Sequence, residues 1–105
     1  LLNFINDDFA REGMLWGLGR LAQVHPEAVQ PAVAQIQACL THTNPQVRAY
    51  AAWCLGILQY QLAKSDLQQL VGDQQPVLLY DQGQLQETTV GQIAAQALAR
   101  LAAAS

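Results

Sequence analysis

The sequence predicts an all-α fold in which helical hairpins stack side by side into an α-α superhelix, with a small β-hairpin inserted near residues 77–88. Three observations predict it: one apolar helical pattern occurs three times, capping residues mark helix starts, and one short stretch alternates as strands do. Self-similarity at a period of about 20–50 residues is the signature of a repeat architecture. We therefore expect about five helices in one domain spanning residues 1–105.

The repeated unit is a helix with Trp, Gly and Leu at matching positions. Residues 10–21 align with residues 47–58 at an offset of 37, and an Arg, the Trp, a Leu, the Gly and a final Leu coincide. A third copy, residues 90–101, follows at an offset of 43 and keeps the apolar positions but loses Arg and Trp. The middle copy starts with Asn44 as the cap and Pro45 as the first helical residue. Its apolar face consists of Val47, Ala51, Cys54, Leu55 and Leu58.

The helices expected between these copies carry their own start and stop signals. Pro26 suits the first position of a helix over residues 26–40, whereas Pro31 falls near the second turn, where it kinks a helix. Residues 65–68, Ser-Asp-Leu-Gln, have the form of a capping box for the next helix. Pro76 ends that helix.

Residues 77–88 do not fit the helical pattern. They contain a β-rich run, a Gly-containing turn and a second alternating run, which is typical of a hairpin with Gly83 at positive φ. Two interpretations stay open. The segment either covers the open end of the core or offers an exposed strand edge to a partner.

The proline-containing helix, the turn Asn44-Pro45-Gln46-Val47-Arg48 and the Ala-rich helix ending at Leu58 resemble a HEAT repeat, of the HEAT-like subtype also found in phycobilisome lyases. On this resemblance, residues 26–60 form a complete repeat. Residues 1–21 form the second half of a truncated repeat, and residues 65–104 form a degenerate C-terminal capping repeat. The resemblance implies a structural ladder of hydrogen bonds along the stack, which ends at Gly91 where the Arg is missing. The ladder residues are Asp7, Arg11, Asn44 and Arg48.

The resemblance also places one stripe of each repeated helix on the inner, concave wall, where polar residues are the default. Two Trp residues at equivalent positions of adjacent repeats are unexpected there, and aromatic side chains are typical interface anchors. We expect a partner-binding surface on this stripe, with both indoles partly exposed; alternatively, each Trp covers its neighbouring helix and shields the core. The expected surface consists of Glu12, Trp16 and Arg20 and of Ala49, Trp53 and Ile57.

The composition argues against several classes of function. The net charge is −3 and the five bases are scattered, so nucleic-acid binding, which depends on phosphate neutralisation, is not expected. No apolar run approaches the roughly 20 residues that span a bilayer, so no membrane partner is expected. The hydrophobic share of 51% against 12% charged residues indicates helices buried on more than one side. The bases are Arg11, Arg20, Arg48, Lys64 and Arg100.

Neither catalysis nor a bound cofactor is expected, because the chain has no phosphate-binding loop and no nucleophile motif. Cys39 and His42 could share a helix face, but a structural zinc needs four ligands, so no metal is expected. His42 lies in a turn, and the cysteines Cys39 and Cys54 lie in apolar helical runs. These positions indicate a solvated histidine and two reduced core thiols. A cytoplasmic location is expected.

The most consistent functional prediction is a non-catalytic scaffold for protein–protein interaction, the C-terminal part of a longer repeat protein, which binds a protein or peptide. The alternative is a helper module of an enzyme: a lyase-like chaperone or a helical domain attached to a catalytic one. A repeat cannot bury its apolar face alone. Self-association through the N-terminal end is therefore expected, with an uncovered patch formed by Phe4, Ile5 and Phe9 beside Leu15 and Leu18.

Overall fold

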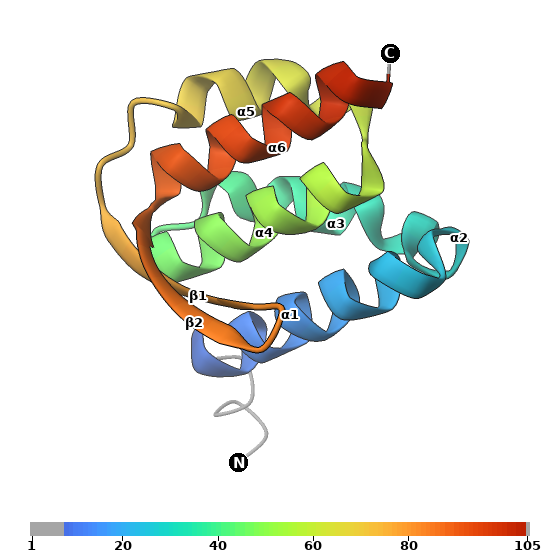
Figure 1. Cartoon of the computed structure of the whole chain (residues 1–105), viewed down its shortest axis with the longest axis horizontal. Helices are drawn as coiled ribbons and strands as arrows, with labels where there is room; N and C mark the ends of the chain where they lie inside the picture. The colour runs from blue at the N-terminus through green and yellow to red at the C-terminus, as the bar shows by residue number, and fades with distance from the viewer. Residues whose placement is uncertain (1–7, 105) are drawn as a thin grey trace.

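A computed structural model describes residues 8–104 of the chain, with side chains from residue 10 onward. Of this part, 74% is helical and the remainder includes one two-stranded antiparallel sheet. Three helices, α1 (Asp8–Val24), α4 (Pro45–Leu58) and α6 (Val90–Ala104), run across the molecule one above another (Figure 1). They coincide with the three copies of the repeated pattern, and α4 packs against both α1 and α6.

The central helix α4 has a strong signal at each end. The Asn44 side chain accepts hydrogen bonds from the backbone N–H groups of Gln46 and Val47, and Pro45 takes the first helical position. Gln59 ends the helix in the left-handed conformation with φ 53°, and the Tyr60 N–H returns to the Leu55 carbonyl. Because helices cover α4 on several sides, almost its whole length is buried.

Small residues set the distance between the stacked helices. A Cβ atom added to Gly56 would come 2.8 Å from the Cα atom of Ala97 on α6. A Cβ atom added to Gly19 would come 2.2 Å from the Trp53 ring on α4. Both glycines occupy the same position of the repeated pattern, so this position lets each helix approach its neighbour closely.

The shorter helices lie between these three. The segment after α1 begins at Pro26 as α2 (Pro26–Val29), passes through the 3-10 turn η2 (Gln30–Ala32) and continues as α3 (Val33–Ala38) and η3 (Cys39–Thr41). The 3-10 turn contains Pro31, so the predicted kink is confirmed.

The predicted capping box at residues 65–68 is wrong. The chain enters the helix earlier, through η4 (Gln61–Ala63), so α5 (Lys64–Leu70) already contains Ser65. Its cap residue, Ala63, has no side chain that could accept a hydrogen bond. The buried Ala63 and Leu67 fix the start by packing instead, which a local capping pattern does not register.

The predicted hairpin is present, formed by β1 (Pro76–Asp81) and β2 (Gln84–Thr89). Its two-residue turn has positive φ at both positions, 53° at Gln82 and 77° at Gly83, as a type I′ turn requires. Val77 and Leu79 of β1 point into the core and are buried, while β2 is largely exposed. The hairpin extends from the start of α6 past α4 toward α1 (Figure 1), so β1 covers the core and β2 faces solvent.

The described helices and the hairpin agree with the predicted mostly helical fold. The predicted α-α superhelix stays a prediction, because residues 8–104 contain only three stacked long helices and a superhelical twist develops over a longer array. Within residues 8–104, no helix is both long enough and apolar enough to cross a bilayer.

Candidate functional site

The inner edge of the hairpin is held by side chains from α1 and α4. The Gln46 side chain pairs with both backbone groups of Leu78: its Nε2 donates to the carbonyl, and its Oε1 accepts from the N–H at 3.1 Å. The Tyr80 N–H donates to the Tyr50 hydroxyl at 3.3 Å, and Trp16 Nε1 donates to the Tyr80 carbonyl at 3.0 Å. Strand β1 therefore lies on the helices as a bound peptide would, with its free backbone groups satisfied by side chains.

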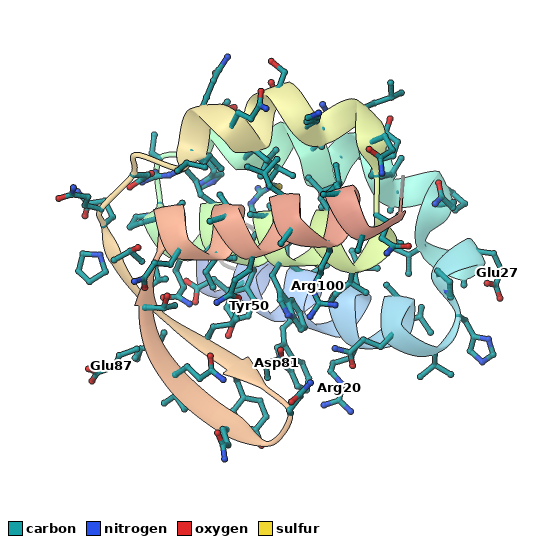
Figure 2. The ribbon with its side chains drawn as sticks, turned by 45° about the horizontal axis from the view of Figure 1, so that its top comes forward. Arg20, Glu27, Tyr50, Asp81, Glu87 and Arg100 are labelled. Atoms are coloured by element: carbon teal, nitrogen blue, oxygen red, sulfur yellow. The ribbon has the colours of Figure 1, made fainter. Side chains whose placement is uncertain are left out.

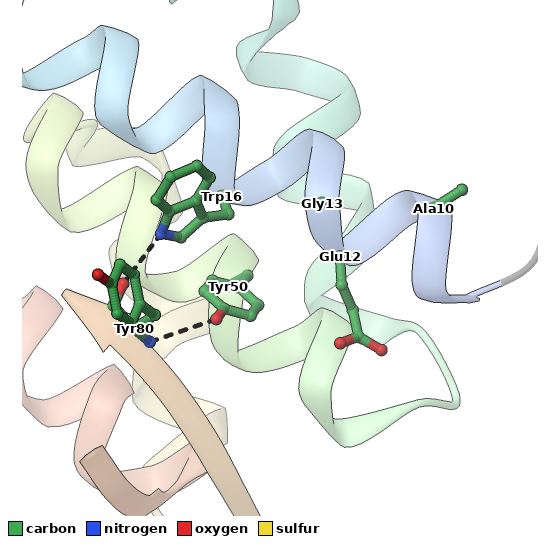
Figure 3. Close-up of a pocket in the computed structure, with 6 residues that line it drawn as sticks. All are labelled: Ala10, Glu12, Gly13, Trp16, Tyr50 and Tyr80. Carbon is green, nitrogen blue, oxygen red and sulfur yellow. Dashed lines mark hydrogen bonds between the residues drawn. The ribbon is translucent and has the colours of Figure 1, made fainter. Parts of the chain in front are cut away.

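A pocket of about 400 Å³ opens beside this contact. Figure 3 shows the three aromatic residues of the described lining, Trp16, Tyr50 and Tyr80, together where β1 passes α1 and α4, with the Glu12 side chain on the α1 side of Tyr50. The ring centroids of Trp16 and Tyr80 are 6.0 Å apart, with the planes tilted by 51°. The lining residues are Ala10, Glu12, Gly13, Trp16, Tyr50 and Tyr80.

The structure corrects the expectation for the middle repeat. Ala49 is fully buried and Trp53 is only 4% exposed, so neither can contact a partner on a free surface. The Trp53 ring packs down over Gly19 of α1 and meets Tyr50 edge-on, with centroids 5.9 Å apart. Trp53 thus covers its neighbouring helix and shields the core, as the alternative to partner binding predicted. Its Nε1 is buried without an acceptor among the described residues, so the packing of the ring, and not a hydrogen bond from its N–H, stabilises Trp53 here.

The other expected surface residues have separate positions. Trp16 is half-buried in the wall of the pocket, and Glu12 lies in the same wall. Arg20 is exposed, and its guanidinium lies 5.6 Å from the centroid of the Trp16 ring, outside the pocket lining. Ile57 is half-buried against the core. Figure 2 shows Arg20, Glu27 and Glu87 pointing outward from separate elements, so these three charges do not form one patch.

Tyr50 and Tyr80 are the aromatic pocket residues that sequence reasoning missed, and Ala10 and Gly13 complete the lining. Tyr50 sits one position after Ala49, off the stripe chosen by alignment, and Tyr80 comes from the inserted hairpin. A signal existed for Gln46, which belongs to the same stripe as Ala49 and Trp53 by its spacing. No spacing rule connects it with Leu78, 32 residues away.

One repeat is joined to the next by Arg48 on α4. Its guanidinium donates to the carbonyls of His42 at 2.8 Å and Thr43 at 3.0 Å, in the turn before α4. It also meets Asp73, in the turn after α5, with Nε and one terminal nitrogen each 3.0 Å from Oδ2. Arg48 therefore bonds turn to turn along the stack, and Asp73 is a partner that the sequence did not indicate.

These features agree with the outcome of comparison with known proteins. Residues 9–58 match the model of the HEAT-like repeat family. Residues 9–58 form a HEAT-like repeat. No curated protein and no solved structure matches the chain.

The other expected rungs of the HEAT-like ladder differ from Arg48. Asp7 lies outside the described residues. Arg11 is half-buried, and its Nε has no acceptor within the described part of the chain. At the third position the backbone N–H of Gly91 donates to the Asp73 carbonyl at 2.7 Å. A Cβ atom at Gly91 would come 2.3 Å from the Val71 carbonyl oxygen, so this repeat needs glycine where the others have arginine.

The N-terminal side of the HEAT-like stack has an apolar hollow of about 400 Å³ between α1 and α3. Met14, Leu15 and Leu18 line it, although Leu15, which was expected in an uncovered patch, is fully buried. Phe4 and Ile5 lie outside the described residues, as does the Phe9 side chain. Self-association through this end stays a prediction.

The candidate chemical groups of the repeat are used structurally. Burial raises the pKa of the Cys54 thiol to about 12, and its Sγ lies 3.0 Å from the Leu15 carbonyl. The nearby Cys39 is also buried, and both cysteines are free thiols. His42 Nδ1 accepts from the Asn44 N–H at 3.0 Å. Among residues 8–104, no group of three or more His, Cys, Asp or Glu side chains is placed to hold a metal ion.

Proposed function

We propose that this chain is a non-catalytic protein-binding module whose partner docks on the outward face of the β-hairpin beside Trp16. HEAT-like repeats generally mediate protein–protein interaction. Within this repeat the hairpin is the part that departs from the regular pattern. Departures from a repeat map to loops on one face, which is often the binding face.

The observation that carries the proposal is a strip of large apolar side chains on the hairpin. Leu78, Tyr80 and Leu85, together called the hairpin face, are 45%, 40% and 62% exposed. Tyr80 and Leu85 are cross-strand partners, so they lie on the same side of the sheet. The Tyr80 ring then continues the strip to Trp16. Contiguous exposed apolar residues rimmed by polar ones are typical of interaction sites.

The hairpin is also held firmly enough to present this face. Side chains of Gln46, Tyr50 and Trp16 fix the backbone of β1, and Val77 and Leu79 anchor it in the core. A preorganised surface loses less conformational entropy on binding than a mobile one. The exposed edge of β2 is paired with no other strand among the described residues, so a partner could extend the sheet there.

The test is site-specific photocrosslinking of the full-length protein in its native cell extract. A photoreactive phenylalanine analogue replaces Leu85 on the hairpin face in one variant. In a matched control it replaces Leu62, which is 76% exposed in η4 beyond the other end of α4. We expect discrete protein adducts at position 85 that position 62 does not give. Equal adduct patterns at both positions, or none at position 85, would contradict the proposed surface.

A further inference from the structure

Three of the six described residues that line the pocket beside the hairpin face are aromatic. Trp16, Tyr50 and Tyr80 come from α1, α4 and β1 respectively. The polar ends of Trp16 and Tyr50 are both tied to the backbone of Tyr80, through its carbonyl and its N–H (Figure 3). The Trp16 N–H is therefore occupied and the Tyr50 hydroxyl already accepts one hydrogen bond, so the rings contribute mainly apolar and π surface to the pocket.

The charge in the pocket is negative. Glu12 is the one ionisable carboxylate among the lining residues that the structure describes. Burial raises the pKa of Tyr50 and the negative charge of Glu12 raises it further, while the hydrogen bond from the Tyr80 backbone lowers it. The Tyr50 hydroxyl is accordingly neutral at ordinary pH, yet it lies close enough to Glu12 to sense the carboxylate. Arg20 touches Trp16 but does not line the pocket.

Electron-rich ring faces together with one carboxylate select for a cation. A bare ammonium or a guanidinium must give up several hydrogen bonds to water when it leaves solvent, and Glu12 is the one charged acceptor among the described lining residues. An alkylated ammonium carries its charge on methyl groups that can lie against the rings without losing hydrogen bonds. The volume of about 400 Å³ lies within the range of about 300–1,000 Å³ typical of ligand sites.

We propose that the pocket formed by Trp16, Tyr50, Tyr80 and Glu12 binds an alkylated ammonium group, supplied by a methylated lysine side chain of the protein partner. The source of the cation rests on the proposed protein-binding function, whereas the chemistry of the pocket does not. The two parts can therefore be tested separately.

The chemistry is tested by titrating the ¹⁵N-labelled protein with choline and with its neutral isostere, 3,3-dimethylbutan-1-ol. The readouts are the indole N–H resonance of Trp16 and the amide of Gly13, with the buried Trp53 indole as an internal reference. We expect a saturable shift of the two pocket resonances by choline in the millimolar range. The isostere should bind at least about fivefold more weakly. Equal binding of the two probes, or no saturable shift with choline, would overturn the proposal.

Two variants locate the site. A Cβ atom at Gly13 meets nothing within 4 Å, and Gly13 lines the pocket, so Gly13→Leu should abolish the choline shift without straining the fold. Gly17→Leu is the matched control, because Gly17 is equally open on α1 but does not line the pocket, and it should bind choline as the parent chain does. Glu12→Gln should weaken choline binding by roughly three- to tenfold and leave the isostere unchanged. Choline binding that survives both Gly13→Leu and Glu12→Gln would overturn the proposal.

The source of the cation is tested with N-acetyl-trimethyllysine methylamide against N-acetyl-lysine methylamide. Binding of the trimethylated probe at least about threefold tighter supports a protein side chain as the ligand. A pocket that binds choline but not the trimethyllysine probe would overturn that source. Photocrosslinking at Leu85 reports on protein binding independently, so failure of the docking surface and failure of the cation pocket give different results.

Discussion

Replacing Arg48 by alanine tests the link between successive repeats. The guanidinium makes contacts with Asp73, His42 and Thr43 at 2.8–3.0 Å. The side chains of Arg48 and Asp73 are 15% and 17% exposed, so their pairing is only partly screened by water. Truncation leaves the Asp73 carboxylate without its cation and two turn carbonyls without their donor.

The magnitude follows from this intermediate burial. A hydrogen bond to a charged group contributes about 1.5–3 kcal/mol, whereas a fully exposed ion pair contributes about 0–1 kcal/mol. Water can replace part of what Arg48 provides, and the four contacts of one guanidinium do not add. We therefore expect Arg48→Ala to lower the free energy of unfolding by roughly 1–3 kcal/mol. About 2 kcal/mol corresponds to a fall in the melting temperature of roughly 8–16 °C for a domain near 100 residues.

The measurement is equilibrium unfolding in urea followed by circular dichroism. With a slope of about 1–2 kcal/mol per M, the midpoint should fall by roughly 1–2 M. The urea midpoint of Arg48→Lys should lie between those of the parent chain and of Arg48→Ala, because lysine keeps the charge but not the planar guanidinium. The control is Arg100→Ala, whose exposed guanidinium makes no hydrogen bond or ion pair within residues 8–104 and which should change stability by less than about 0.5 kcal/mol. If Arg48→Ala and Arg100→Ala have the same midpoint, the turn-to-turn link contributes nothing and the reasoning is refuted.

Substitutions at the glycines of α1, at the tryptophans and at Cys54 test how the helices pack. Gly19→Ala should destabilise by about 1–3 kcal/mol because the added methyl meets the Trp53 ring. Gly13→Ala, in open space on the same helix, should stabilise by about 0.5–1 kcal/mol, so equal effects in thermal melts would contradict the packing. In single-tryptophan variants, acrylamide should quench Trp16 more than Trp53, and equal quenching would show that the pocket is closed. Because the Cys54 thiol ionises near 9 when unfolded but at about 12 when buried, stability should fall as pH rises from about 9 to about 12. Replacing Cys54 by alanine should reduce this loss of stability with pH, measured by urea unfolding at several pH values. An unchanged pH dependence would argue against Cys54 as its source. Sedimentation should reveal self-association through the N-terminal end, and a strict monomer at high concentration would count against it.

Local patterns predicted most of the secondary structure. Asn44 and Pro45 fix the start of α4 through the chain's own backbone donors, and Gly83 fixes the hairpin turn through its positive φ. These features depend on neighbours within a few residues, which the sequence displays directly. The repeat offset likewise identified α1, α4 and α6, because equivalent helices need the same apolar spacing to stack. The start of α5 was missed because packing of Ala63 and Leu67, not a cap, decides it.

The candidate site could be predicted from the sequence only in part. Sequence alone determined that Trp16 and Trp53 occupy equivalent helix positions, and that a hairpin interrupts the last repeat. Only the tertiary structure decided that Trp53 is buried over Gly19 while Trp16 turns to the hairpin. Equivalent positions have different neighbours in a stack, and exposure depends on the neighbour rather than on the position. In the pocket, Trp16 is hydrogen-bonded to the backbone of Tyr80, which lies 64 residues away in the sequence. Such a contact does not recur at a regular spacing, so no sequence pattern predicts it.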